Sequence, residues 1–150
     1  MDLATGLQRE VVTAQAPEKF SFPLALSPDG HTLAGIINVA GKEQLFRVGV
    51  DGSGYRKLNG ARFENSNALS WSADGAQILV HATFQQASEN HTLLVRVSQS
   101  GGNPEIIRSF LGCCGGFSLS GSRIAVTDTV TMSPEVWVLD GVSAFLKTAR

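Results

Sequence analysis

Short apolar stretches separated by polar, glycine-containing turns run along most of the chain. From Gln44 to Val50 the side chains alternate, with Phe46, Val48 and Val50 on one face and Arg47 on the other. Such period-two alternation is typical of a β-strand with one buried face. Between residues 20 and 140 no stretch has the 3.6-residue apolar spacing of an amphipathic helix. The pattern predicts an all-β chain.

The predicted strands form three similar groups. In each group one strand precedes a turn, a second follows it, and a third comes after a polar connection. The strands before the turn are Phe22–Leu26, Asn67–Trp71 and Gly116–Leu119. Those after it are Leu33–Ile37, Ile78–Phe84 and Ile124–Val130, and the third strands are Gln44–Val50, Thr92–Val97 and Glu135–Leu139. A short fourth strand closes the first two groups, at Tyr55–Leu58 and Glu105–Arg108.

One turn motif marks the same place in every group. The segment Ser27-Pro28-Asp29-Gly30 recurs as Ser72-Ala73-Asp74-Gly75 and, in degraded form, as Ser118-Leu119-Ser120-Gly121. The last glycines of these three segments are 45 and 46 residues apart. A repeat of this length corresponds to one four-stranded blade of a β-propeller. The repeat therefore predicts consecutive blades.

The residues of this motif suit a tight turn. In such a turn proline presets φ, aspartate accepts backbone hydrogen bonds, and glycine tolerates a positive φ. We assign this structural role to Pro28, Asp29, Gly30, Asp74, Gly75 and Gly121. The aspartates are accordingly interpreted as turn formers and not as catalytic acids.

At these residues the chain resembles the WD40-like repeat of TolB-type β-propellers, whose signature is a Ser-Pro-Asp-Gly turn. The resemblance covers residues 20–140 and is strongest at Ser27-Pro28-Asp29-Gly30 and Trp71-Ser72-Ala73-Asp74-Gly75. In this family the repeat occurs in periplasmic TolB proteins, in the propeller half of prolyl-oligopeptidase-like serine peptidases, and in sensor regions of bacterial signalling proteins such as kinases and transcription factors. The resemblance alone favours a periplasmic or extracytoplasmic location, and the sequence leaves the compartment open.

The repeat divides the chain as follows. We predict a partial β-propeller over residues 1–150, in which residues 1–14 end a preceding blade and residues 20–60, 65–110 and 111–140 are blades. Residues 141–150 are expected to form a C-terminal tail or a short helix. Roughly three four-stranded antiparallel blades and part of an N-terminal one result.

Composition narrows the classes of partner. Hydrophobic residues make up 43% and charged residues 17% of the chain, which is typical of a folded globular protein. The net charge is −1 and no basic block is present, so the sequence argues against a nucleic-acid partner. No apolar run reaches the roughly 18 residues of a membrane helix, and residues 1–14 lack the features of a signal peptide.

Two segments resemble catalytic or nucleotide-binding loops without meeting their requirements. Gly116-Phe117-Ser118-Leu119-Ser120 approaches a nucleophile elbow, but the elbow ends in glycine and joins a strand to a helix. Here Ser118 falls where the repeat places a strand and its turn. The glycine-rich stretch 112–116 lacks the lysine and the following helix of a phosphate loop. Neither is assigned chemistry.

The histidines and cysteines also fail to form a convincing site. His81 and His91 flank the hairpin of the second group, but two histidines without a third ligand make a poor metal site. We interpret them, with His31, as exposed or edge residues. The adjacent Cys113 and Cys114 are interpreted as two small buried hydrophobes, because neighbouring cysteines rarely bridge each other.

The sequence therefore predicts a non-catalytic propeller segment that binds or scaffolds. We expect a protein or peptide partner, or the remaining blades of a propeller, and no cofactor or metal. Two alternatives remain open: the propeller lobe of a prolyl-oligopeptidase-like serine peptidase, and the sensor region of a bacterial signalling protein.

Overall fold

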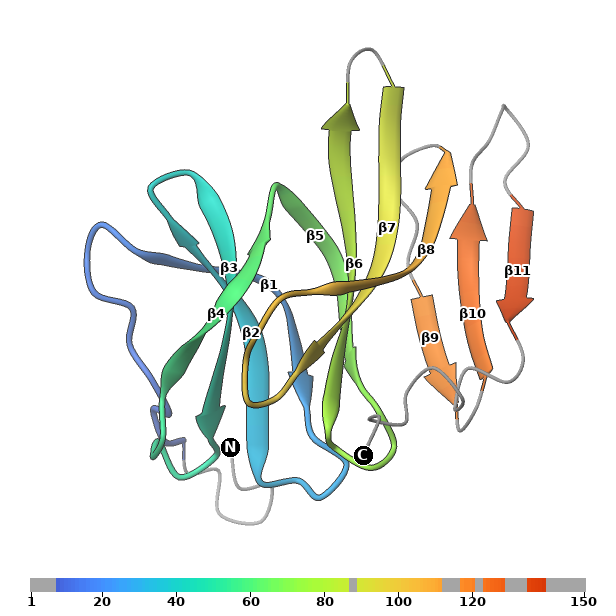
Figure 1. The fold of residues 1–150 in the computed structure, drawn as a ribbon. Coiled ribbons are helices and arrows are strands. Elements are labelled where there is room, and N and C mark those ends of the chain that lie inside the picture. Colours follow the sequence, from blue (N-terminus) through green and yellow to red (C-terminus); the bar gives the residue numbers. More distant parts are fainter. Residues whose placement is uncertain (1–7, 87–88, 112–116, 121–122, 129–134, 140–150) are drawn as a thin grey trace.

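The fold was described from a computed structural model, which places residues 8–86, 89–111, 117–120, 123–128 and 135–139. Within these ranges the chain forms antiparallel β-strands and no helix, so the all-β prediction is confirmed. Within each sheet every strand pairs with the next one along the chain, which makes the sheet a simple meander (Figure 1).

The strands group into three sheets. The first sheet contains β1 (Lys19–Leu26), β2 (Thr32–Val39), β3 (Lys42–Gly49) and β4 (Arg56–Phe63). The second sheet contains β5 (Asn65–Trp71), β6 (Gln77–Gln86), β7 (Glu89–Ser98) and β8 (Glu105–Leu111). In the third sheet the described residues form β9 (Phe117–Ser120), β10 (Arg123–Asp128) and β11 (Glu135–Leu139).

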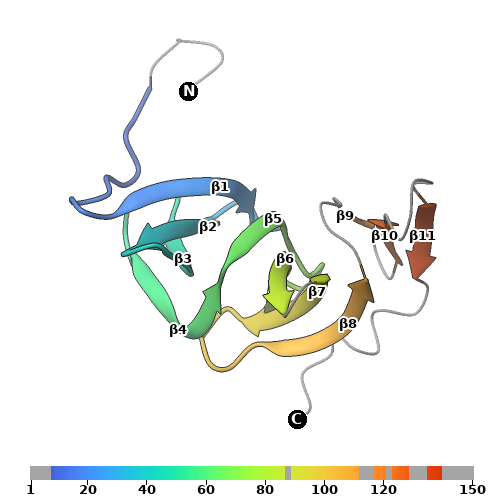
Figure 2. The same ribbon diagram turned by 90° about the horizontal axis from the view of Figure 1, so that it is seen from above.

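The three sheets stand side by side in a row, as the view from above shows (Figure 2). Neighbouring sheets contact each other through their first strands, because β1 contacts β5 and β5 contacts β9. The arrangement follows from the pattern of apolar residues, because β2, β3, β6 and β7 carry them on both faces and each face needs a neighbour.

The main core lies between the first and second sheets. Its buried members are Ala34, Ile36, Leu45, Leu58 and Phe63 from the first sheet and Trp71, Ile78, Val80, Ala82, Val95 and Val97 from the second. Two polar contacts fix the sheets against each other. The indole Nε1 of Trp71 donates to the carbonyl oxygen of Ala25 at 3.1 Å, and the backbone N–H of Ser66 donates to the buried carboxylate of Glu43 at 2.5 Å.

Strand β4 runs further than the sequence indicates. It continues to Phe63, whereas the repeat predicts an end at Leu58. A register shift between Gln44 and Phe46 interrupts its pairing with β3, and Gly60 adopts a φ of 84°. A Cβ at this glycine would lie 2.7 Å from the carbonyl oxygen of Gly102 in the second sheet, so only glycine lets the strand pass that turn.

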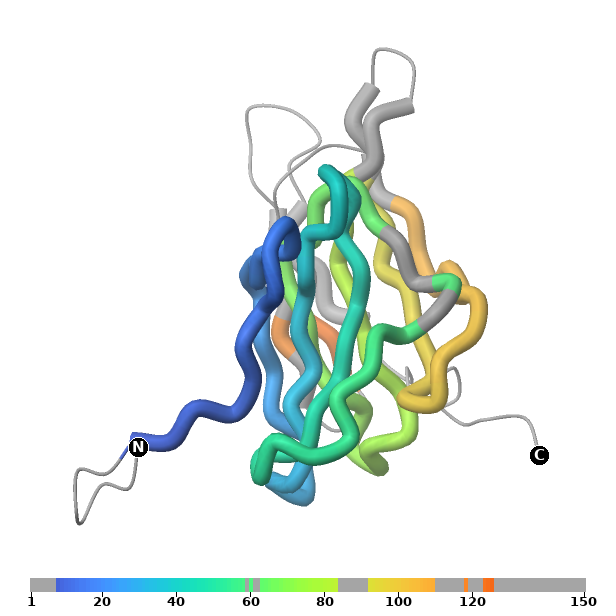
Figure 3. The backbone as a smooth tube through the Cα atoms, turned by 90° about the vertical axis from the view of Figure 1, so that its left-hand side faces the viewer, coloured from blue at the N-terminus to red at the C-terminus, as the bar shows by residue number. Residues whose placement is uncertain are grey.

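Residues 1–14 are predicted to end a preceding blade, and the structure describes residues 8–14 of this segment. Residues 8–14 form no strand. Val11, Val12 and Ala14 instead pack against the outer face of the first sheet, where Ile37, Phe46 and Val48 are buried. Figure 3 shows this segment running beside the first sheet before the chain turns into β1. The apolar residues that read as a strand are thus used to cover a sheet face. Residues 141–150, the expected tail or helix, lie outside the described part.

Candidate functional site

The turn between β1 and β2 is held by a buried serine. The Oγ of Ser27 donates to Asp29 Oδ1 at 2.6 Å and accepts the backbone N–H of Thr32 at 2.9 Å. The same Asp29 oxygen accepts the backbone N–H of His31 at 2.9 Å. These bonds, the one from Ser27 first, lower the pKa of Asp29. Gly30 closes the turn with a φ of 73°.

The turn between β5 and β6 repeats this geometry. Ser72 Oγ donates to Asp74 Oδ1 at 2.6 Å and accepts the N–H of Gln77 at 2.9 Å, and the N–H of Ala76 donates to Asp74 at 3.0 Å. Gly75 has a φ of 70°, and a Cβ there would lie 3.9 Å from the ring of Pro28. The two turns are therefore neighbours at one end of the sheets. Gly121, the third of the assigned turn glycines, lies outside the described part of the chain.

Ser27, Asp29 and His31 have the residue types of a hydrolase triad, but their contacts are those of a turn. In a triad the carboxylate orients the imidazole, and the imidazole takes the serine proton. Here Asp29 accepts from the backbone N–H of His31, and the hydroxyl of Ser27 is directed to the carboxylate itself. The arrangement stabilises the chain reversal and provides no activated nucleophile.

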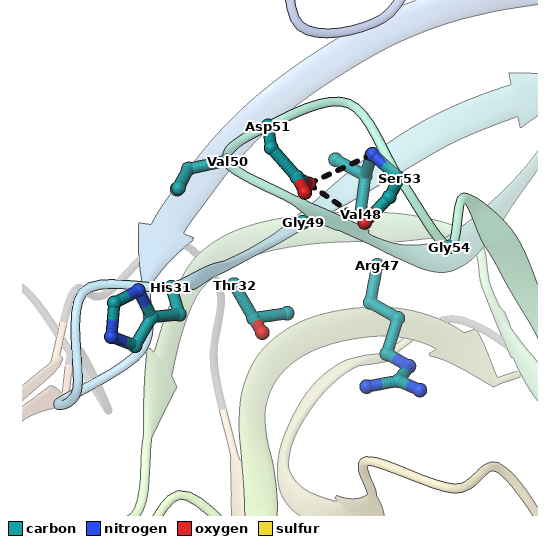
Figure 4. A pocket seen from close by; sticks show the side chains of 9 residues that line it. All are labelled: His31, Thr32, Arg47, Val48, Gly49, Val50, Asp51, Ser53 and Gly54. Atoms are coloured by element: carbon teal, nitrogen blue, oxygen red, sulfur yellow. Dashed lines mark hydrogen bonds between the residues drawn. The ribbon is translucent and has the colours of Figure 1, made fainter.

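An open pocket of about 470 Å³ lies beside the β1–β2 turn. Its wall combines the start of β2 with the end of β3 and the turn that follows it, as Figure 4 shows. The lining residues are His31, Thr32, Arg47, Val48, Gly49, Val50, Asp51, Ser53 and Gly54. Polar and apolar groups contribute equally to this surface, which reaches from the β1–β2 turn to the β3–β4 turn.

The turn on the far side of this pocket is preorganised. Asp51 accepts the backbone N–H of Ser53 at 2.9 Å and its hydroxyl at 2.7 Å. These bonds, the hydroxyl first, lower the pKa of Asp51, and the nearby Arg9 acts in the same direction. The Arg9 guanidinium donates to the carbonyl oxygen of Val50 at 2.5 Å. Asp51 therefore remains a carboxylate at neutral pH.

Arg47 brings a cation to the opposite side of the pocket. In Figure 4 its guanidinium lies away from the hydrogen-bonded Asp51 and Ser53. It donates to the side-chain oxygen of Gln99, in the second sheet, at 3.4 Å, and no carboxylate among the described residues forms an ion pair with it. Burial, and then the charge of Arg56, lower the pKa of Arg47.

A second cavity, of about 480 Å³, lies between the N-terminal segment and β4. It is lined by Glu18, Tyr55 and Lys57 among others. Lys57 and Glu18 form an ion pair there. Because the cation of this cavity is neutralised by the chain itself, the pocket at Arg47 is the better candidate for a charged ligand.

The remaining sequence candidates are separated in space. His31 lies in the β1–β2 turn, whereas His81 lies within β6 and is only 1% exposed, so its interpretation as an exposed or edge residue is wrong. Its neighbours across the sheet are Ala68 and Leu94, which shows that it stands in the middle of the second sheet. His91 belongs to β7 and pairs in register with Phe84. Ser118 is exposed on β9.

Among the described residues no group of three or more His, Cys, Asp or Glu side chains is placed to hold a metal ion. In the same part of the chain no helix has the length and apolar character needed to cross a membrane. Cys113 and Cys114, with the glycine-rich stretch 112–116, lie outside the described residues.

Sequence reasoning missed the contribution of two kinds of residue. Ser27 and Ser72 anchor the repeated turns, and their regular place in the motif was a signal for this. Arg47 was assigned only to the polar face of a strand. Its position in the pocket depends on the pairing of β3 with β4 and on the second sheet, which no local pattern reports.

Comparison with known proteins identifies the fold. No protein-family model matches the sequence, and a search of the curated proteins finds no match. TolB from Acinetobacter baumannii is 16% identical, with a TM-score of 0.68 over 93% of this chain and 34% of that one. A putative TolB from Agrobacterium tumefaciens is 22% identical, with a TM-score of 0.61 over 85% of this chain and 44% of that one.

A peptidase has a similar region. The acylaminoacyl peptidase of Pyrococcus horikoshii is 14% identical, with a TM-score of 0.59 over 81% of this chain and 24% of that one. The chain thus spans 24% to 44% of the length of these proteins. At such identities the likeness shows the fold alone. The chain consists of consecutive β-propeller blades that resemble those of TolB and of other propeller proteins.

Proposed function

We propose that the chain is a non-catalytic propeller segment that binds a peptide or protein partner. The pocket beside Arg47 is the observation that carries this proposal. It is open, lies between two preorganised turns, and offers a charged side chain together with backbone groups. Propellers commonly use the loops at the ends of their blades for binding, and a few convergent polar groups in a concave surface are typical of recognition sites.

The residue contacts favour binding over catalysis. In the β1–β2 turn the side chains of Ser27 and Asp29 bond to each other and to the backbone, and His31 contributes its backbone N–H. Ser118 belongs to the third sheet and the pocket to the first. Neither serine has a histidine base placed to activate it among the described residues, as nucleophilic catalysis requires.

The test is a selection of random displayed peptides on the whole chain, followed by titration of a selected peptide into isotope-labelled protein. We expect the largest amide shifts at Thr32, Val48 and Gly49, with the amides of β7 as an internal reference. The chain should release no product from ester or peptide reporter substrates. Absence of binding peptides, shifts confined to other regions, or hydrolysis that depends on Ser27 or Ser118 would overturn the proposal.

One alternative has an observation in its favour. The likeness to the Pyrococcus horikoshii acylaminoacyl peptidase supports a propeller lobe of a serine peptidase. Such a lobe would act with a hydrolase domain encoded beside it. A Gly-x-Ser-x-Gly hydrolase segment in the adjoining coding sequence would support this reading, and its absence would leave the binding segment as the better description.

A further inference from the structure

The first and second sheets carry different charges at one repeat position. Arg47 on β3 pairs in register with Arg56 on β4. At the matching place in the second sheet Arg96 on β7 pairs with Glu105 on β8. The second pair forms a salt bridge, with Arg96 Nη2 at 2.7 Å and Nε at 2.8 Å from the same carboxylate oxygen. The first pair places two cations side by side.

Only neutral groups of the described residues compensate the two arginines. Arg47 donates to the side-chain oxygen of Gln99 at 3.4 Å, and Arg56 donates to the backbone carbonyl of the same residue at 2.8 Å. Arg47 is partly buried, and its Nε atom is buried without an acceptor in the described part of the chain. Arginine keeps its charge at neutral pH, so the cost of holding two guanidinium groups together persists.

We propose that the pocket at Arg47 binds a carboxylate of an acidic peptide, which takes the place that Glu105 occupies beside Arg96 in the second sheet. The inference rests on the proposed function and names the class of partner. A carboxylate entering the pocket reaches a guanidinium in its wall and reduces the repulsion between Arg47 and Arg56. A guanidinium presents parallel donors that match the two oxygens of a carboxylate.

The other wall of the pocket carries a negative charge. Asp51 lies there as a carboxylate, fixed by its bonds to Ser53. A phosphate monoester carries close to two negative charges at neutral pH and is repelled more strongly by this group than a carboxylate is. The two guanidinium groups also attract a dianion more strongly, and Asp51 offsets part of that gain, so the phosphoserine peptide in the test below measures which anion the pocket prefers.

The test measures binding by fluorescence anisotropy on the whole chain. The probe is a labelled peptide of alternating Gly and Glu with an amidated C-terminus. The matched peptide of alternating Gly and Gln, also amidated, measures how much of the binding requires the side-chain charge. The same Gly–Gln peptide with a free C-terminus tests whether a terminal carboxylate binds in place of a side-chain one. A fourth peptide replaces Glu with phosphoserine. We expect the Gly–Glu peptide to bind at least about tenfold more tightly than the amidated Gly–Gln peptide, because hydrogen bonds to charged groups are the strong ones.

Arg56→Glu is the decisive variant. It recreates in the first sheet the Arg–Glu pair of the second sheet, so the chain itself supplies the carboxylate. We expect an affinity loss of about tenfold or more, without a fall in the urea midpoint. Arg47→Gln should weaken binding as strongly. Arg96→Gln is the matched control, since it removes an equally placed guanidinium from the second sheet, and it should leave binding unchanged.

The outcomes are distinguishable. If selected peptides shift the amides of the pocket but Arg56→Glu has no effect, or Gly–Gln binds as well as Gly–Glu, the carboxylate inference is wrong and the proposed function survives. Tighter binding of the phosphoserine peptide would replace the carboxylate with a dianion and also overturn the inference. If no peptide binds at the pocket, both proposals fail.

Discussion

Equivalent repeat positions form the outer face of the first sheet and one face of the second sheet. The face of the second sheet packs against the first sheet, whereas the outer face of the first sheet contacts the N-terminal segment. In the second sheet these positions are Trp71, Ile78, Val80, Ala82, Val95 and Val97, all buried against the first sheet. In the first sheet they are Leu26, Leu33, Gly35, Ile37, Phe46 and Val48. Here Leu26 is 53% exposed although its counterpart Trp71 is 5% exposed.

The difference separates two sources of burial. Ile37, Phe46 and Val48, on the central strands, are buried although none of the described sheets covers them. Val11, Val12 and Ala14 lie against them, and the Phe46 ring packs between Phe20 and Tyr55 with centroid distances of 5.2 and 5.6 Å. On β1, by contrast, Phe22, Leu24 and Leu26 remain exposed. Side chains on the central strands are thus buried by nearby residues of the same sheet and of the N-terminal segment. Side chains on the first strand of a sheet need a neighbouring sheet to become buried.

The largest expected effect tests this dependence directly. Trp71→Ala removes a buried ring and its bond to Ala25, and should lower the free energy of unfolding by about 3–5 kcal/mol. Leu26→Ala, at the same repeat position, should lower it by less than about 1 kcal/mol, because the side chain is already half exposed. Urea unfolding of both variants measures the two values. Equal losses would show that Leu26 is covered in solution.

A smaller effect is expected at the turn glycines. Both Gly30 and Gly75 have a positive φ, and a Cβ has room at each, so the cost of Gly→Val is backbone strain of about 1–3 kcal/mol. Gly75→Val should cost more than Gly30→Val, because the Ser72 turn is more deeply buried and faces Pro28. We expect Gly121→Val to be mildest. Urea midpoints give the ranking, and a larger loss at Gly121 would contradict the registration of the third repeat.

The smallest effect concerns pH. Hydrogen bonds from Ser27 and Ser72 lower the pKa values of Asp29 and Asp74 below the usual 3.8. A carboxyl with a lowered folded-state pKa stabilises the protein above that usual value, and the contribution is lost as the pH falls through the folded pKa. Stability should therefore decline below about pH 4. Asp74→Asn should flatten the decline in urea titrations; an unchanged pH profile would mean that the turn does not depend on this carboxylate.

The sequence predicts the repeated parts of this molecule well. The strands around each turn follow from alternation and from the spacing of Gly30 and Gly75, because strand and turn preferences act over a few residues. The places where prediction fails depend on residues that are distant in the sequence. β4 extends past Leu58 by passing the turn at Gly102, and His81 is buried by its neighbours in the middle of the second sheet.

The candidate site was harder to anticipate than the fold. The turn at Asp29 could be read from a local motif, but Arg47 becomes part of a pocket only through the pairing that places Arg56 beside it and through the approach of Gln99. Such a site is a property of register and of sheet packing. A single sequence with no structure gives the residue type and the strand face, and no more.

The arrangement of the sheets in a row affects how much each sheet is stabilised by its neighbours. β1 and β9 both contact β5, so the second sheet alone among the three has sheet neighbours on both sides in the described residues. When each unit is stabilised by nearest-neighbour terms, the energy of the array behaves as that of a one-dimensional chain of coupled elements. Among the described sheets, opening then costs the least free energy in the first and third and the most in the second, which contains the Ser72 turn.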